Sequence, residues 1–270
     1  MAKGTSKLNT VLLTLAETAQ RFGWIVVGIL MIVLTVSAIG ARDEAHIEKV
    51  TPIIEPLVSG ETLLTEAELL EVLASSFTKP MDQLKLSDID VELVEEVLEG
   101  QPFIAEADAY IDDDLHLTVR VTQRVPLLRI ITGEGQNYFF DENGVRMPLS
   151  ETYTPRVPVA TGFIVPWTNN YREQEESQLA DLVALARYLR TDPFLDALIE
   201  QIDVQADGQL VLAPKLGDQL IELGRYDKTE TPARLQRLKT FYREGLPYEG
   251  WRKYRSFDLR FDRQVVARKR

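Results

Sequence analysis

The chain has 270 residues and no cysteine, and its 42 acidic residues outnumber its 30 basic residues to give a net charge of −12. The absence of cysteine excludes disulfides and thiolate chemistry, and the acidic balance is poorly suited to binding nucleic acid. A chain of this length accommodates two domains of about 80–150 residues beside a membrane segment.

The uncharged run from Phe22 to Ala41 predicts a transmembrane helix. About 20 residues at about 1.5 Å each cross a bilayer core of about 30 Å. Basic residues outnumber acidic ones in residues 1–21, so we expect these residues in the cytoplasm and residues 42–270 outside it. The side chains expected to face lipid are Trp24, Ile25, Val26, Leu30, Met31, Ile32, Val33 and Leu34.

Two alternatives to a membrane anchor remain for this run. Small residues at Ala38 and Gly40 would suit a cleaved signal peptide, but the apolar core of such peptides is only about 7–15 residues long. A buried helix of a soluble protein is disfavoured by the length of the uncharged run. The run also lacks a GxxxG motif, so close pairing with a second membrane helix is not expected.

Residues 42–125 predict a small α+β domain. A strand is expected near residues 45–54, although Pro52 weakens that pattern. Thr65 and Glu68 match a capping box, which predicts that a helix starts directly after the threonine.

A second helix is expected between a cap at Ser87 and a stop at Gly100. Apolar and polar residues then alternate along 103–111 and along 115–122, which predicts two paired strands. The three aspartates at 112–114 suit the turn between them. The domain therefore has the order strand, helix, helix, strand, strand.

Residues 126–270 predict a mixed α/β domain built on an antiparallel-rich sheet. One helix is expected over residues 173–189, and Thr231 followed by Pro232 predicts the start of another. Turn signals such as Asp207-Gly208 separate short apolar runs. The strands expected from these runs are 127–131, 138–141, 145–147, 157–160, 201–205, 209–212, 219–223, 254–261 and 264–267.

No residue pattern indicates catalysis, a metal or a cofactor. The two histidines are His46 and His116, and the second falls on the polar face of a strand without an oriented partner. The aspartates at 112–114 lack the spaced ligands of a calcium loop, and Gly133 and Gly135 precede no helix that would bind phosphate. We therefore expect a protein that is not an enzyme.

Several local motifs resemble the FtsQ/DivIB family of bacterial cell-division proteins, in a form similar to its Bacteroidetes branch. They are Gln-Pro-Phe-Ile at 101–104, Val-Thr-Gln-Arg-Val-Pro at 121–126, Tyr-Phe-Phe-Asp-Glu-Asn-Gly at 138–144, Met-Pro-Leu-Ser at 147–150 and Asp-Leu-Arg-Phe at 258–261. The resemblance covers nearly the whole chain. It implies that residues 42–125 are a POTRA domain and residues 126–270 the β domain of the family.

The resemblance further implies a scaffold of the divisome that sits in the bacterial inner membrane at the division site, with residues 42–270 in the periplasm. It would bind FtsB-like and FtsL-like coiled-coil proteins by adding a strand to the C-terminal sheet edge, and other divisome proteins through the POTRA domain. It would thereby link early and late division proteins for septal wall synthesis. No nucleic acid or small-molecule substrate is implied.

By position, the residues that the resemblance assigns to partner binding are Arg260, Phe261, Gln264, Val265, Val266, Ala267 and Arg268. Leu259 shares the period of Phe257, so we expect it in the core instead. The basic residues 268–270 suit either a partner contact or the protection of an exposed strand edge against aggregation.

Two other classes of protein stay open at this point. A POTRA-containing envelope chaperone or translocation accessory would share the first domain, but the chain has neither a second such unit nor a series of lipid-facing strands. An envelope enzyme would need a nucleophile, a base and an orienting group, which the sequence does not indicate.

Overall fold

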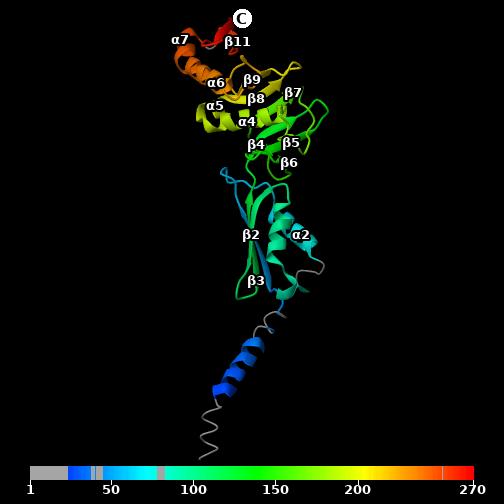
Figure 1. Cartoon of the computed structure of the whole chain (residues 1–270). Coiled ribbons are helices and arrows are strands. Elements are labelled where there is room, and N and C mark those ends of the chain that lie inside the picture. The colour runs from blue at the N-terminus through cyan, green and yellow to red at the C-terminus, as the bar shows by residue number, and fades with distance from the viewer. Residues whose placement is uncertain (1–23, 38–39, 41–44, 78–82, 251) are drawn as a thin grey trace, which may run out of the picture.

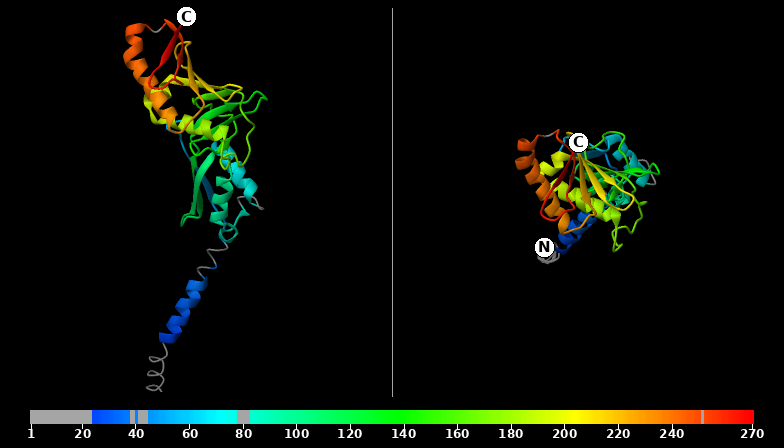
Figure 2. Two further views of the ribbon diagram at one scale, coloured as in Figure 1. Left: turned by 45° about the horizontal axis from the view of Figure 1, so that its top comes forward. Right: turned by 90° about the horizontal axis from the view of Figure 1, so that it is seen from above.

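A computed structural model describes residues 24–37, 40, 45–77, 83–250 and 252–270. A three-stranded unit and a nine-stranded domain follow one another along the molecule, and the C-terminus lies at the end of the larger domain that is far from the smaller one (Figure 1). Figure 2 shows the same arrangement after rotation.

Residues 24–37 form a helix whose large apolar side chains are exposed. They include all eight residues expected to face lipid. The rest of the expected span from Phe22 to Ala41 lies largely outside the described residues. Within the described part of the chain, we find no helix with the length and apolar character needed to cross a membrane. The anchor therefore stays a prediction.

The smaller unit has the predicted order of strand, helix, helix, strand and strand. Its elements are β1 (Lys49–Glu55), α2 (Glu66–Ser76), α3 (Val91–Glu99), β2 (Ile104–Ile111) and β3 (His116–Gln123). The sheet order is β1-β3-β2, with β1 parallel and β2 antiparallel to β3. Pro52 lies within β1, and edge strands tolerate a residue that lacks an N–H group.

The two helices of this unit bury their apolar faces against the sheet. Leu69 and Leu73 of α2 and Leu98 of α3 are fully buried in one cluster with residues of β3. The capping box at the start of α2 is present as predicted, because the Thr65 amide donates to the Glu68 carboxylate at 2.6 Å and the Glu68 amide donates to the Thr65 hydroxyl at 3.2 Å.

Two local predictions for this unit are wrong. Ser87 does not cap the second helix, because residues 86–88 form a separate 3₁₀ turn and Asp90 accepts the capping hydrogen bond from the Leu93 amide at 3.2 Å. Ala105 is exposed although it was expected on the buried face. An irregularity in the pairing between Ile104 and Glu106 shifts the alternation at the start of β2.

The larger domain is built on a mixed sheet with the order β12-β11-β10-β9-β8-β7-β4-β5-β6. Pairing is parallel between β4 and β7, β7 and β8, and β10 and β11, and antiparallel elsewhere. The strands are β4 (Pro126–Ile131), β5 (Asn137–Asp141), β6 (Arg146–Met147), β7 (Val159–Gly162), β8 (Ile199–Val204), β9 (Leu210–Pro214), β10 (Leu220–Gly224), β11 (Tyr254–Asp258) and β12 (Val266–Lys269).

Helices pack on this sheet and form the main core with it. They are α4 (Gln178–Thr191), α5 (Pro193–Leu198), α6 (Glu230–Thr240) and α7 (Leu246–Glu249), with a π-helical turn at Phe241–Gly245 between the last two. Leu182 and Leu189 of α4 and Leu238 of α6 are fully buried in this core. Its largest fully buried side chains include Tyr138, Phe140 and Phe257 of the strands.

Both long helices of this domain start at residues other than those predicted. The helix expected from residue 173 begins at Gln178, where Ser177 accepts a hydrogen bond from the Ala180 amide. The helix expected after Thr231 begins at Glu230, because the Asp227 carboxylate accepts hydrogen bonds from the amides of its first turn. Thr231 is buried, and its hydroxyl instead accepts a hydrogen bond from the Asp227 amide at 2.9 Å.

The two sheets are joined by a shared apolar cluster. Leu63, from the segment before α2, is 2% exposed and packs with Phe139 and Met147 of the larger domain. Its amide donates to the side chain of Gln123 at 2.6 Å, and its carbonyl accepts from the hydroxyl of Ser150 at 2.5 Å. We call this group of five residues the Leu63 joint.

A buried ion pair lies beside the Leu63 joint. The Arg124 guanidinium lies 3.2 Å from the Asp141 carboxylate, which is buried and also accepts a hydrogen bond from the Val145 amide. The sheets therefore meet in a packed and hydrogen-bonded contact, close to the expected domain boundary after Val125.

Candidate functional site

The candidate site is the free edge of the larger sheet. β12 pairs antiparallel with β11 on one side and has no strand on its other side among the described residues. Its residues are half-buried or exposed. A free edge exposes backbone N–H and C=O groups that another extended chain can pair with.

Side chains of β12 alternate between the two faces of the sheet. Val265, just before the strand, and Ala267 pack against the core that includes the helices. Val266 and Arg268 lie on the opposite face, opposite Asp258 and Ser256 of β11. An added strand would therefore meet an apolar row on one face and a charged row on the other.

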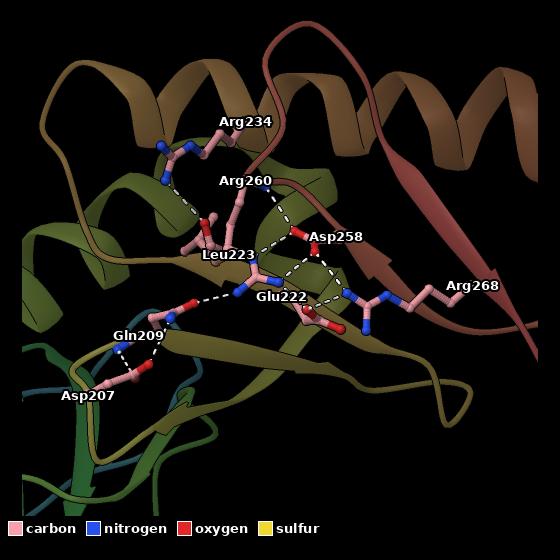
Figure 3. A network of polar contacts seen from close by, with 8 residues as sticks. All are labelled: Asp207, Gln209, Glu222, Leu223, Arg234, Asp258, Arg260 and Arg268. Carbon is pink, nitrogen blue, oxygen red and sulfur yellow. Dashed lines mark hydrogen bonds and ion pairs between the residues drawn. The ribbon is translucent and has the colours of Figure 1, made fainter.

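A charged network on that second face connects the last three strands, as Figure 3 shows. Arg260 donates to both oxygens of Asp258 at 2.8 and 2.6 Å, to Glu222 at 2.7 Å and to Gln209 at 2.7 Å. Arg268 approaches from β12 and lies 3.3 Å from the same Asp258 carboxylate and 3.6 Å from Glu222. The parallel register places Glu222 of β10 directly beside Asp258 of β11.

Asp258 is the buried centre of this network. Its side chain is 0% exposed, and the hydrogen bonds from Arg260 hold the pKa of its carboxyl below the usual value despite burial. The same contacts raise the pKa of Arg260. Both groups are therefore charged at neutral pH, and the paired form is the one that the fold stabilises.

Replacing Arg260 with alanine is expected to lower the free energy of unfolding by about 3 kcal/mol. The change removes both guanidinium hydrogen bonds to a buried carboxylate, and breaking a buried pair costs more than the pair itself contributes. Arg268→Ala is the matched control, because this side chain makes only a longer contact with Asp258, at 3.3 Å, and its loss should cost less than about 1 kcal/mol. Urea titrations of the full chain in detergent compare the two variants, and equal destabilisation would contradict this assignment.

The segment between β11 and β12 carries the aromatic residue of the Asp-Leu-Arg-Phe motif. Leu259 is fully buried, as predicted, and its amide donates to the carbonyl of Glu222 at 2.9 Å. Phe261 is 47% exposed and lies outside both strands, so the expected single strand over 254–261 is wrong after Asp258. Arg237 of α6 donates to the carbonyls of Leu259 and Phe261 and fixes this segment to the helix.

A groove of about 560 Å³ runs between this segment and α6. Phe241 and Val265 contribute apolar surface to it, and Arg237 and Arg263 contribute charge. Val265, which lines the groove, directly precedes β12 in the chain.

Of the seven residues assigned by position to partner binding, Arg260 reaches away from β12 toward Glu222 and Gln209. Arg260, Phe261, Gln264 and Val265 lie between the strands, and Val266, Ala267 and Arg268 lie in β12.

Sequence reasoning missed Asp258, Glu222 and Gln209 as parts of the site. A signal was available for the first, because Asp258 stands two residues before Arg260 in the motif, a spacing that suits a local side-chain pair. The other two come close only through the fold.

The described residues contain no group of three or more His, Cys, Asp or Glu side chains placed to hold a metal ion. The candidate site itself offers backbone groups, apolar side chains and ion pairs.

Comparison with known proteins identifies relatives of the chain. Residues 125–268 match the family described as FtsQ/DivIB, C-terminal related. The chain is 32% identical to the cell division protein FtsQ of Salinibacter ruber over 164 residues, which are 57% of this chain and 60% of that protein. It is 27% identical to the cell division protein FtsQ of Rhodothermus marinus over 186 residues, which are 68% of this chain and 67% of that protein.

The chain therefore aligns with about two thirds or less of the length of these two relatives. The matched region includes the whole of the nine-stranded sheet up to Arg268 of β12. The family predicted from the sequence motifs is confirmed, and the chain belongs to the FtsQ/DivIB family of cell-division proteins.

Proposed function

We propose that this protein is a non-enzymatic scaffold of the bacterial divisome that accepts a strand of a partner along β12. The observation that carries the proposal is the free edge of β12, which ends the sheet in the part of the chain that matches the family. The partners that this role requires are FtsB-like and FtsL-like proteins, which pass the membrane once and carry a coiled coil. Main-chain hydrogen bonds would supply affinity, and the residues around β12 would supply specificity.

The other sheet edges among the described residues support this choice of site. β6 at the opposite end of the large sheet has only two residues. β1 contains Pro52, which cannot donate a backbone hydrogen bond. Two amides of β2 are bonded to glutamates of α3. β12 is the edge that combines four residues of regular strand with an adjoining groove.

We further propose that residues 22–41 anchor the protein in the inner membrane, with residues 42–125 as a POTRA domain in the periplasm. The exposed apolar side chains of residues 24–37 support the anchor, and the strand, helix, helix, strand, strand order supports the POTRA assignment. An anchor confines the scaffold to the plane in which partners that cross the membrane diffuse, which raises their effective concentration. The POTRA unit would contact other divisome proteins.

A fluorescent fusion of the full chain is expected to gather in a band at the division site, and depletion is expected to give filaments or chains of undivided cells. Fluorescence microscopy with time-controlled depletion measures both. Uniform staining of the envelope together with normal division would contradict the scaffold and favour the envelope chaperone or translocation accessory.

Phe261→Glu is expected to abolish co-purification of the two coiled-coil proteins from detergent-solubilised membranes. The ring is exposed in the segment between β11 and β12, and a carboxylate there would be desolvated by any partner that covers it. A deletion after Asp262 removes β12 and should have the same effect. Phe163→Glu is the control, because Phe163 is an exposed aromatic residue directly after β7, which four strands separate from β12 in the sheet. Unchanged recovery with Phe261→Glu and with the deletion would disprove strand addition at β12.

A further inference from the structure

The outer edge of β2 is occupied by two carboxylates of the neighbouring helix. The amide of Ala109 donates to Glu95 at 2.8 Å, and the amide of Ala107 donates to Glu99 at 3.4 Å. β2 is an edge strand whose other side pairs with β3. These two amides would otherwise face outward, where a further strand would pair with them.

The spacing of the helix matches the spacing of the strand. Glu95 and Glu99 are four residues apart on α3, which corresponds to a rise of about 6 Å. Ala107 and Ala109 are two residues apart on β2, which corresponds to a rise of about 6.6 Å. The order is reversed, because the earlier glutamate meets the later alanine, so the helix and the strand run in opposite directions. Each carboxylate therefore lies in register with one outward amide.

The core fixes α3 in this register. Val94 and Leu98 each directly precede one of the two glutamates, and both are buried against the sheet. The other two glutamates of α3, Glu92 and Glu96, have no hydrogen bond to β2 among the described contacts. Two of the four glutamates of α3 therefore contact the edge of β2 and two do not. The contact is specific to Glu95 and Glu99 and is not a general effect of an acidic helix surface.

We propose that Glu95 and Glu99 take the place of a neighbouring strand and keep the β2 edge closed, and that a second copy of this chain pairs with β2 when they are removed. We choose a second copy as the partner because its β2 strand is identical to the edge with which it would pair. Two identical edge strands can pair antiparallel about a twofold axis, which brings the same backbone groups of each copy together. The exposed Glu106 and Asp108 on the same strand would face their counterparts across such a pair, so like-charge repulsion adds to the closure of the edge. The closed edge keeps the smaller unit from self-association at the concentrations that a membrane imposes.

The test compares three double variants of the full chain in detergent. Glu95→Ala/Glu99→Ala removes both acceptors. Glu92→Ala/Glu96→Ala is the matched control, with the same helix, the same residue types and the same change of charge. Glu95→Gln/Glu99→Gln removes the charge but keeps an oxygen acceptor at each position.

Three measurements report on the edge. Deuterium exchange with fragmentation gives the exchange rates of the amides of Ala107 and Ala109. Because the chain has no cysteine, a single Asp108→Cys reporter in each protein, on the exposed face of β2, allows disulfide trapping of a β2-to-β2 pair. Sedimentation velocity gives the oligomeric state without trapping.

In the alanine variant we expect exchange at Ala107 and Ala109 to be at least about tenfold faster than in the parent in the monomeric fraction at low concentration. We also expect dimers that are trapped through residue 108 at higher concentration. The control and the glutamine variant are expected to stay closed and monomeric. Circular dichroism confirms that each variant remains folded.

Three outcomes would overturn the proposal. The first is an alanine variant that is folded and monomeric with no trapped dimer. The second is equal dimer formation in the Glu92→Ala/Glu96→Ala control, which would assign closure to net charge. The third is dimer formation in the glutamine variant equal to that of the alanine variant, which would show that hydrogen bonds to the edge are not what closes it. None of these outcomes depends on partner binding at β12.

Discussion

Ala267→Pro is expected to weaken partner binding at β12 by at least about a hundredfold while the sheet stays folded. The Arg270 amide donates inward to the carbonyl of Lys253 at 3.2 Å. Amides alternate in direction along a strand, and the extra residue at the pairing irregularity lies in β11, so the alternation along β12 is unbroken. Because the Arg270 amide points toward β11, the amides of Ala267 and Lys269 point outward. Proline at 267 removes an outward donor and places its ring where the added strand must lie.

Isothermal titration of the purified full chain with the proposed coiled-coil partners in detergent measures this effect. The expected loss of affinity combines one missing hydrogen bond with a steric clash. Each tenfold loss of affinity corresponds to about 1.4 kcal/mol of binding free energy. Ala267→Val is the control, because valine keeps the amide and favours a strand. Val266→Pro should behave differently, since its amide points inward and its loss would detach β12 from β11. Unchanged affinity of Ala267→Pro would exclude β12 as the acceptor edge.

Leu63→Ala is expected to lower the free energy of unfolding by about 3 kcal/mol and to loosen the contact between the two sheets. Leu63 is buried between Phe139 and Met147, and truncation there leaves a cavity that the flanking hydrogen bonds to Gln123 and Ser150 prevent from collapsing. The larger domain keeps its own core, so the loss acts mainly on the connection.

Val58→Ala is the matched control for this change, because Val58 lies in the same segment and is fully exposed. Its effect should stay within about 0.5 kcal/mol. Urea titration gives the stability, and deuterium exchange of residues 123–126 and 139–147 gives the loosening. If exchange there is unchanged in Leu63→Ala, the Leu63 joint does not hold the sheets together.

The parts of the fold that were predicted correctly depend on neighbours in sequence. The capping box at Thr65, the alternation of β3 and the turn at Asp207-Gly208 each involve residues that are at most a few positions apart, and all three are present. The prediction of Ser87 as a cap failed because Ser87 and Asp90 are both good capping residues, and the start of the apolar face at Val91 decides between them.

The parts that were missed depend on contacts between distant residues. Glu222 and Asp258 become neighbours because β10 and β11 pair in parallel across α6, and no local period encodes that pairing. Leu63 stands in a short segment that resembles an ordinary loop, yet it packs into the other domain. The hydrogen bonds from β2 to Glu95 and Glu99 need both the helix register and the strand register, which only the folded chain supplies together.

The Leu63 joint has a consequence for the reach of a partner. β12 lies at the end of the larger domain that is far from the smaller unit (Figure 1). The Leu63 joint packs the two sheets against each other, so the smaller unit separates β12 from the proposed anchor. A proposed coiled-coil partner that starts from the same membrane would then have to extend its pairing segment as far as this edge. Each added heptad lifts that segment by about 10 Å, which is the length of about three strand residues. The proposed scaffold would thus select partners by the length of their coiled coil.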